Sequence, residues 1–254
     1  MIRIALLLLF VVALVCSVEA SIKHDEVEPF KQPKPTSVSE AAGVKFKPQL
    51  YIAKGCTSFP AVNSDGATSG GLKGTYGVDA CEVAPLGSQV YGRAKQHKGV
   101  WAIMYSWYFP KSFYGNEPDG RHDWTSMIMW FDDITLEKPT VLGVSLSISA
   151  TEYSKKTFIA SAFYAGSHQL GYNRSDGSNT TIRVYHSTKM SSPAFLGLSQ
   201  YEGEYQDLIM WSQLSDDARL ALENPKNFKH KLVPFNDDNF LTGATTGARS
   251  RKRS

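Results

Sequence analysis

The segment VWAIMYSWYF, residues 100–109, carries no charged side chain and sets the fold class of this chain. Its largest side chains recur at every second position, namely Trp101, Ile103, Tyr105, Trp107 and Phe109. This period places alternate side chains on one face of a β-strand. A continuous apolar run of this kind is typical of a strand in the middle of a sheet. We therefore predict a buried central strand that ends at Pro110.

Other strand patterns follow along the chain. Residues 127–131, MIMWF, form a second apolar run, and between residues 142 and 149 apolar side chains alternate with glycine or serine. Alternation of this type indicates a strand with one face in the core. Residues 158–163 and 181–185 are predicted as two further strands.

Helical signals are few. Ser215 can cap a helix whose first turn carries Asp216 and Asp217, acids that favour the positive end of the helix dipole, and Pro225 stops it. A short helix is also predicted over residues 205–211. Because neither an internal repeat nor a linker is visible, the sequence predicts one mainly β domain with some α. This domain is a central β-sandwich decorated by a few helices.

The ends of the chain differ from this domain in composition. Residues 1–20 have the pattern of a secretory signal peptide, because Arg3 precedes an apolar run at 4–15 that small residues close. The mature domain is expected over residues 21–241, with a proline-rich extended arm at 21–39. Residues 242–254 are expected to form a loose basic tail. The protein is therefore predicted to be secreted and extracellular.

The cysteines and the charge narrow the class further. Cys16 leaves with the signal peptide, so Cys56 and Cys81 remain as an even pair that should form a disulfide outside the cell. The net charge is +3, and four positive charges lie in the last six residues. The domain itself is close to neutral, so a nucleic-acid partner is not predicted.

Familiar catalytic motifs are missing. The glycine-rich segment 66–74 lacks the G-K-[ST] ending of a phosphate loop and is interpreted as a turn region. The sequence contains neither G-x-S-x-G nor H-E-x-x-H, so we predict no enzyme and no catalytic residue. Asn173 and Asn179 begin sequons in a polar surface stretch and are predicted N-glycosylation sites, with unused sequons as the alternative.

The segment DGRHDWT, residues 119–125, is the strongest candidate for a functional site. It places Arg121, His122, Asp123 and Trp124 in successive positions, on what we interpret as a loop after the central strand. Charged and aromatic residues that a loop carries together are typical of a binding site. The alternative to a binding site is a purely structural role, in which an aromatic side chain covers an ion pair.

Two blocks of sequence resemble a known family. AIMYSWYFPK at 102–111 and RHDW at 121–124 are similar to motifs of the necrosis and ethylene-inducing peptide-like proteins, or NLPs, of plant-associated microbes. Further blocks, such as SGGLK at 69–73 and LIMWSQL at 208–214, extend the resemblance over essentially the whole mature chain. The single cysteine pair resembles the type 1 branch. The family implies a central β-sandwich with surrounding helices.

The resemblance also implies a mode of action that this sequence alters. Cytolytic NLPs are not enzymes; they bind sphingolipid head groups of the plant plasma membrane and use a divalent cation in an acidic cavity. The family motif reads GHRHDWE, and an acid follows FPK. Here Ser112, Gly120 and Thr125 replace ligands of the cation, and only Asp123 is retained. Because Ca²⁺ or Mg²⁺ needs six or more oxygens, we predict no metal and no cofactor. The alternative is a cavity rebuilt by Glu117, Asp119 or Asp132.

These observations lead to one hypothesis. The protein is predicted to be a monomeric, non-cytolytic NLP effector in the host apoplast, perceived as a molecular pattern by a plant surface immune receptor without causing necrosis. The alternatives are a cation-dependent cytolysin and a non-lytic binder of glycans or sphingolipid head groups. The predicted recognition motif comprises Ala102, Ile103, Met104, Tyr105, Ser106, Trp107, Tyr108, Phe109, Pro110, Lys111 and Ser112. The degenerate heptapeptide comprises Asp119, Gly120, Arg121, His122, Asp123, Trp124 and Thr125.

Overall fold

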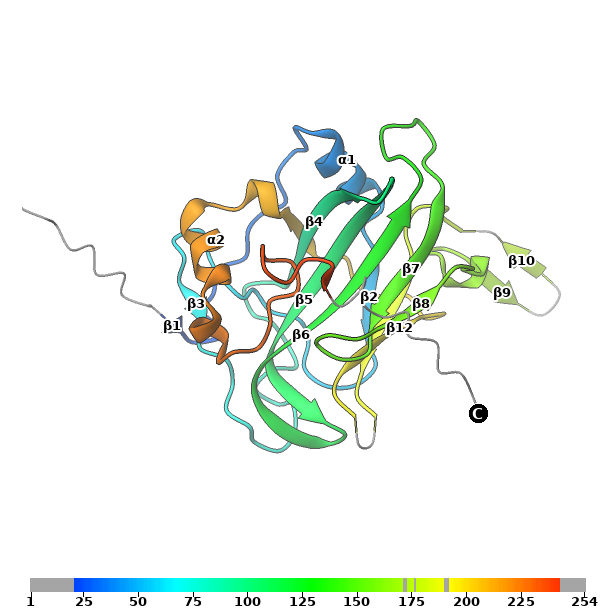
Figure 1. Cartoon of the computed structure of the whole chain (residues 1–254). Coiled ribbons are helices and arrows are strands. Elements are labelled where there is room, and N and C mark those ends of the chain that lie inside the picture. The colour runs from blue at the N-terminus through cyan, green and yellow to red at the C-terminus, as the bar shows by residue number, and fades with distance from the viewer. Residues whose placement is uncertain (1–20, 171–172, 176, 190–191, 243–254) are drawn as a thin grey trace, which may run out of the picture.

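The computed structural model describes residues 21–170, 173–175, 177–189 and 192–242. Its largest element is a six-stranded sheet with strand order β13–β4–β5–β6–β7–β8 (Figure 1). All neighbours in this sheet are antiparallel except β13 and β4, which pair in parallel. The strand bounds are β4 Gln89–His97, β5 Val100–Tyr114, β6 Glu117–Phe131, β7 Val141–Ser147, β8 Tyr153–Lys156 and β13 Asp207–Met210.

A smaller sheet packs against the large one. It has the order β12–β11–β2, and the ring of His186 on β11 stacks on Phe109 of β5 with centroids 3.9 Å apart. The two sheets make the predicted β-sandwich. The bounds are β2 Gln49–Ile52, β11 Arg183–Ser187 and β12 Phe195–Leu198, and two short pairs join β1 Ser21–Ile22 to β3 Thr68–Ser69 and β9 His168–Leu170 to β10 Asn173–Ser175.

The central strand β5 is covered on both faces. On one face the Tyr105 hydroxyl donates to the carbonyl oxygen of Gly43 in helix α1, Val38–Lys45, at 2.8 Å. On the opposite face Tyr91 of the neighbouring strand stacks on Phe235, near the C-terminus. The predicted buried strand is therefore confirmed, and it continues beyond Pro110, whose carbonyl accepts the Leu72 N–H at 2.7 Å.

Two helices and three short 3₁₀ turns complete the fold over the residues that the structure describes. Helix α2, Asp216–Glu223, begins after Ser215, whose hydroxyl accepts the Ala218 N–H, so the predicted cap is confirmed. Helix α1 was not predicted; it starts from a capping box in which Ser37 and Glu40 satisfy each other's backbone N–H groups. The 3₁₀ turns are η1 Ser161–Phe163, η2 Trp211–Gln213 and η3 Pro225–Phe228.

Two sequence predictions of secondary structure are wrong. Residues 158–163 are not a strand, because Phe158 is 81% exposed and the strand lies earlier, at β8. Residues 205–211 are not a helix, because β13 pairs with β4 at the edge of the large sheet and its residues Leu208, Ile209 and Met210 are buried. In both cases the pairing partner, rather than the local pattern, decides the conformation.

The predictions for the ends have mixed outcomes. The arm at 21–39 is extended up to the helix that begins at Val38, and Gln32 Oε1 ties it to the sheet by accepting the Leu208 N–H at 3.2 Å. The predicted signal peptide at 1–20 lies outside the described residues, as does the predicted tail from residue 243 onward. No helix within the described part of the chain is long and apolar enough to cross a bilayer.

Candidate functional site

The DGRHDWT segment lies within strand β6 and not on a loop, so that prediction is wrong. β6 pairs with β5 along nearly its whole length, with Phe109 opposite Asp123 and Ser112 opposite Gly120. The pairing tolerates two residues in the left-handed region, Gly120 at φ +117° and His122 at φ +63°. Only glycine enters this region without steric cost, so His122 is held there by its surroundings.

An aromatic cluster provides those surroundings. The Tyr108 hydroxyl donates to Ser69 Oγ at 3.0 Å, and its oxygen lies 2.7 Å from Nδ1 of His122. The Phe228 ring meets the rings of Tyr108, His122 and Trp124 edge-on at 5.5 to 5.8 Å. Burial lowers the pKa of His122 to about 4, helped by Lys229, Arg121 and Lys231, so this imidazole is neutral at physiological pH.

A glycine fits this cluster closely. Gly71, in the glycine-rich segment interpreted as a turn, has φ +65°, and a Cβ atom there would lie 2.8 Å from Cε1 of His122. The same segment accepts a hydrogen bond from the Arg121 guanidinium through the Gly70 carbonyl at 2.8 Å. The segment therefore packs against the heptapeptide, which gives its glycines a structural reason.

Asp123 is half-buried and carries the retained carboxylate. Burial raises its pKa to about 7, although the Trp124 N–H donates to Oδ1 at 2.9 Å and Lys231 also favours the charged form. Lys231 further lies 3.8 Å from the carboxylate of Asp119. An ammonium group thus faces the two acids of the heptapeptide.

The donor set around Asp123 does not fit a hard divalent cation. The described residues contain no group of three His, Cys, Asp or Glu side chains arranged to hold a metal. The buried Ser112 Oγ has no hydrogen-bond partner among them. Asp132 lies at the far end of β6, roughly 30 Å along the strand from Asp123. It is engaged by the N–H groups of Asp133 and Thr140, both at 2.7 Å. Glu117 lies at the opposite end of β6, next to the β5–β6 turn.

The predicted recognition motif is buried near its C-terminal end, at Lys111. Lys111 is only 2% exposed; its ammonium donates to the carbonyls of Thr75 and Gly77 at 3.0 and 2.6 Å and lies over the Phe113 ring. Burial lowers the pKa of Lys111, against the influence of Asp79. These contacts tie β5 to the segment that the Cys56–Cys81 disulfide closes. The predicted disulfide is present.

The remaining predicted sites are only partly visible. Asn179 is exposed on the surface, whereas the side chain of Asn173 in β10 lies outside the described residues. Sequence reasoning missed His186, Phe228 and Lys231, which pack against the two motifs from distant parts of the chain. No local sequence pattern marks them, because only the tertiary fold brings them there.

The fold matches a class of toxin-fold proteins. The chain is similar to the structure described as "Toxin fold as basis for microbial attack and plant defense", with a TM-score of 0.76, 32% identity, and coverage of 88% of this chain and 99% of that one. The model of the necrosis inducing protein (NPP1) family matches residues 40–244. The chain belongs to this family, so the resemblance inferred from its motifs is confirmed.

Individual relatives are similar over most of their length. An NLP effector protein of Phytophthora capsici is 46% identical, covering 87% of this chain and 90% of its own. Non-toxic HaNLP3 superposes with a TM-score of 0.77 at 36% identity, covering 87% of this chain and 97% of its own. NLPPya in complex with mannosamine has a TM-score of 0.75 at 32% identity, with coverage of 89% and 99%.

The buried histidines predict a loss of stability in acid. The pKa of His122 is lowered to about 4, and that of His186 is lowered to about 3 by burial alone. Below pH 6.5 the unfolded chain therefore binds protons that the folded protein does not. Each group lowers the free energy of unfolding by about 1.4 kcal/mol per pH unit between pH 6.5 and 4.

The titration of Asp123 opposes this loss of stability in acid. Because its folded pKa is about 7, the folded protein takes up a proton between pH 7 and 4 that the unfolded chain does not yet bind. As the pH falls, the unfolding free energy of the wild type should decrease with a slope that corresponds to about one proton taken up on unfolding. The slope for Asp123→Asn should correspond to about two protons. Urea unfolding at steps of pH measures this difference. Equal slopes for the two proteins would contradict the assignment of Asp123.

Proposed function

We propose that the protein is a secreted, non-cytolytic NLP effector of a plant-associated microbe, perceived by a plant surface immune receptor and causing no necrosis. The observation that carries this proposal is the neighbourhood of Asp123. An ammonium group, Lys231, lies near the carboxylates where the family resemblance implies a divalent cation. The other acid of the heptapeptide, Asp119, already lies 3.8 Å from the same ammonium group.

The altered charges should weaken the binding of a divalent cation strongly. The resemblance implies that two formal negative charges of the cavity have been replaced by Ser112 and Thr125. A charged contact contributes about 1.5 to 3 kcal/mol, so the loss corresponds to at least a hundredfold in cation affinity. The similarity to non-toxic HaNLP3 agrees with this interpretation.

The second candidate is a non-lytic binder of glycans or sphingolipid head groups. It is favoured by the similarity to NLPPya, which has been seen with mannosamine and with glucosamine. A cation-dependent cytolysin is the third candidate, and it requires a different ligand set from the one around Asp123. In each case we propose a monomer that acts in the apoplast without catalysis.

Calorimetric titration with CaCl₂ and MgCl₂ tests the loss of the cation site. We expect no saturable heat up to about 10 mM of either salt, because one carboxylate cannot replace the inner hydration shell of these ions. Leaf infiltration of the same protein is expected to leave tissue intact at a dose at which a cytolytic NLP kills it.

Asp123→Ala is the matched control for this titration. A millimolar or tighter site in wild type that disappears in Asp123→Ala would show that other oxygens complete the cavity. Necrosis by the wild type together with that site would make the cytolysin the correct function. Necrosis that does not depend on a divalent cation would contradict both the non-cytolytic effector and the cation-dependent cytolysin.

A further inference from the structure

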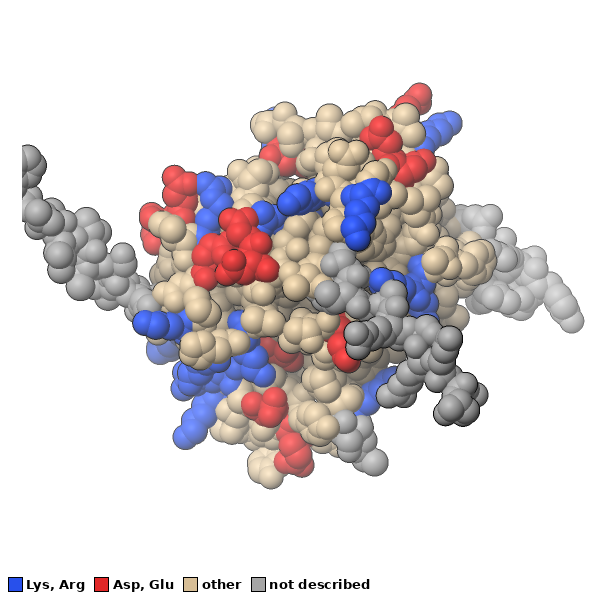
Figure 2. All heavy atoms as spheres, in the orientation of Figure 1, with Lys and Arg blue, Asp and Glu red and all other residues tan. Residues whose placement is uncertain are grey.

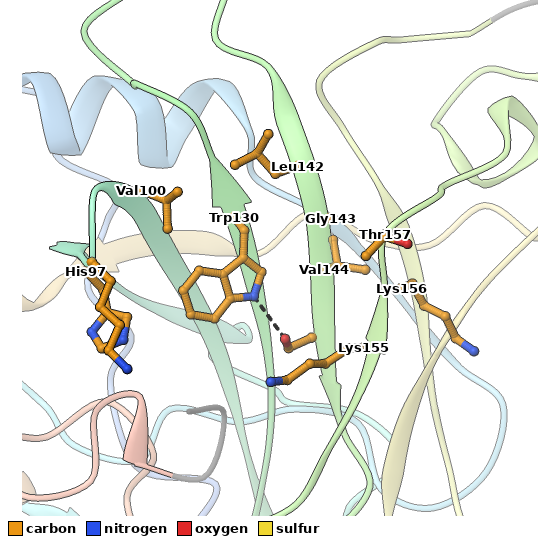
Figure 3. Close-up of a pocket in the computed structure, with 11 residues that line it drawn as sticks. His97, Val100, Trp130, Leu142, Gly143, Val144, Lys155, Lys156 and Thr157 are labelled. Atoms are coloured by element: carbon orange, nitrogen blue, oxygen red, sulfur yellow. Dashed lines mark hydrogen bonds between the residues drawn. The ribbon is translucent and has the colours of Figure 1, made fainter. Parts of the chain in front are cut away.

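A groove on the large sheet is separate from the heptapeptide. It has a volume of ≈ 380 Å³ and lies at the β6–β8 side, with Trp130 of β6 on its floor (Figure 3). Trp130 is seven residues from Asp123 on the same strand, which corresponds to roughly 23 Å. The groove therefore needs an explanation independent of the cation cavity.

The indole ring of Trp130 is held in place but left uncovered by its neighbours in the sheet. Its Nε1 donates to Ser145 Oγ at 2.9 Å, which fixes the orientation of the ring. Its two cross-strand partners are Ala102 and Gly143, residues that are too small to cover an indole. The His97 ring meets Trp130 edge-on at 6.3 Å. The result is a flat, preorganised aromatic surface that is partly exposed.

Positive charge surrounds this ring. Lys98, Lys155 and Lys156 line the groove, and all three are exposed. None of them forms a salt bridge with an acid in the described part of the chain. In the space-filling view, basic side chains lie over the upper part of β5 to β7, whereas acidic ones gather over α2 and at the top (Figure 2).

The strand register distinguishes two adjacent lysines. Lys155 pairs with Ser145, which pairs with Ile128, so Lys155 shares the face of Trp130. Lys156 pairs with Val144 and therefore belongs to the opposite face. In Figure 3 the ammonium group of Lys155 accordingly points toward the indole, and that of Lys156 points away from it.

We propose that this groove binds an acidic oligosaccharide, in which a uronic-acid ring stacks on Trp130 and its carboxylate pairs with Lys155 and Lys98. A fixed indole offers the flat apolar surface on which one face of a pyranose ring can pack. Separate lysines provide point charges that can pair with the carboxylates of such a ligand.

The positive charge of the groove disfavours the basic tail of the chain as its occupant. The basic tail of the chain itself carries four positive charges in its last six residues, so it would be repelled by the lysines of the groove. An anionic ligand is complementary to this surface in charge, and the groove's volume lies within the usual range for small-ligand sites. The site would act independently of divalent cations and of immune perception.

Calorimetry with trigalacturonic acid at low ionic strength tests this proposal on the full mature chain. We expect Lys155→Gln to weaken binding by about threefold or more, and Trp130→Leu by about tenfold. Lys156→Gln alters a side chain that points away from the indole, so it should weaken binding less than Lys155→Gln does. Lys34→Gln is the control outside the groove with the same change in charge, and it should bind within about twofold of wild type. A neutral glucose trisaccharide should bind at least about tenfold more weakly.

Other outcomes would overturn the proposal. Absence of binding at about 5 mM trigalacturonate would remove the ligand class. Equal effects of Lys155→Gln and Lys156→Gln, or full competition by inorganic phosphate, would reduce the site to unspecific electrostatics. Trp130→Phe retains an aromatic ring and guards against misfolding of the leucine variant. If both variants fold, as their melting temperatures report, and both bind like wild type, stacking plays no role.

Discussion

A synthetic peptide spanning residues 102–125 is expected to trigger an oxidative burst or ethylene release in plants that perceive this family. Recognition of a linear segment requires only a continuous strand, whereas cytolysis requires a charged cavity that the fold assembles. Extended peptides bind receptors through their backbone and through alternate side chains in pockets. We therefore expect elicitation to persist in a chain that has lost its cation ligands.

The intact protein should be far less active than this peptide. Trp107, Tyr108 and Phe109 are at most 1% exposed, and β5 is paired on both edges. Exposing a central strand requires nearly global unfolding, which costs on the order of 5 kcal/mol or more, so the accessible fraction is on the order of 10⁻⁴ or lower. Protease digestion should release the activity, and protease inhibitors in the leaf should suppress it.

Alanine variants of the peptide locate the anchor residues. Replacing Trp107 or Tyr108 should reduce the response by about tenfold or more, because large aromatic side chains dominate binding interfaces. Replacing Ser112 or Asn116 serves as the matched control and should change the response little. A peptide that is inert at micromolar dose, beside an active peptide from a cytolytic relative, would contradict the proposed perception. Full activity of the intact protein under protease inhibition would contradict the need for release.

Removal of the disulfide should have the largest effect on stability. Cys56 and Cys81 are 25 positions apart, and closing a loop of this length restricts the unfolded chain. The double variant Cys56→Ser/Cys81→Ser is expected to lose about 3.5 kcal/mol of unfolding free energy. Guanidinium titration of the variant and the oxidised wild type measures the difference.

The chemistry of the same bond can be checked separately. The intact mass of freshly secreted protein should lie 2 Da below that of the reduced form, as expected for one bond between two thiols. Two free thiols in that material would contradict the pairing and the argument for an oxidising compartment. An unfolding free energy that differs by less than about 1 kcal/mol would indicate that the reduced chain already keeps this loop compact.

Local signals explain what the sequence predicted correctly. β5 is apolar at nearly every position, so both its burial and its central place follow from the residues themselves. Helix α2 carries its own cap and its own acidic first turn. Neither prediction depends on knowing which segment packs against the element. The same holds for the disulfide, which follows from the number of cysteines.

Tertiary pairing explains the rest. The first half of β6 reads EPDGRHD, a polar stretch with glycine and proline that has no strand pattern of its own. It is extended because β5 continues beside it. Helix α1 has almost no amphipathic pattern, and it is held by close packing, since a Cβ atom on Gly43 would lie 2.8 Å from Met210 Sδ. Lys231 reaches Asp123 only once the C-terminal segment has folded back.

The two parallel pairings of the sandwich have a consequence for how the chain folds. β4 pairs with β13, joining Gln89 to Asp207, and β2 pairs with β11, joining Gln49 to Arg183. Contacts between positions so far apart are slow to form, because the entropy of closing the loop is lost before the contacts compensate it. An N-terminal portion that emerges first during synthesis lacks its edge partner. We therefore expect folding of the sandwich to be completed only after β13 has been synthesised.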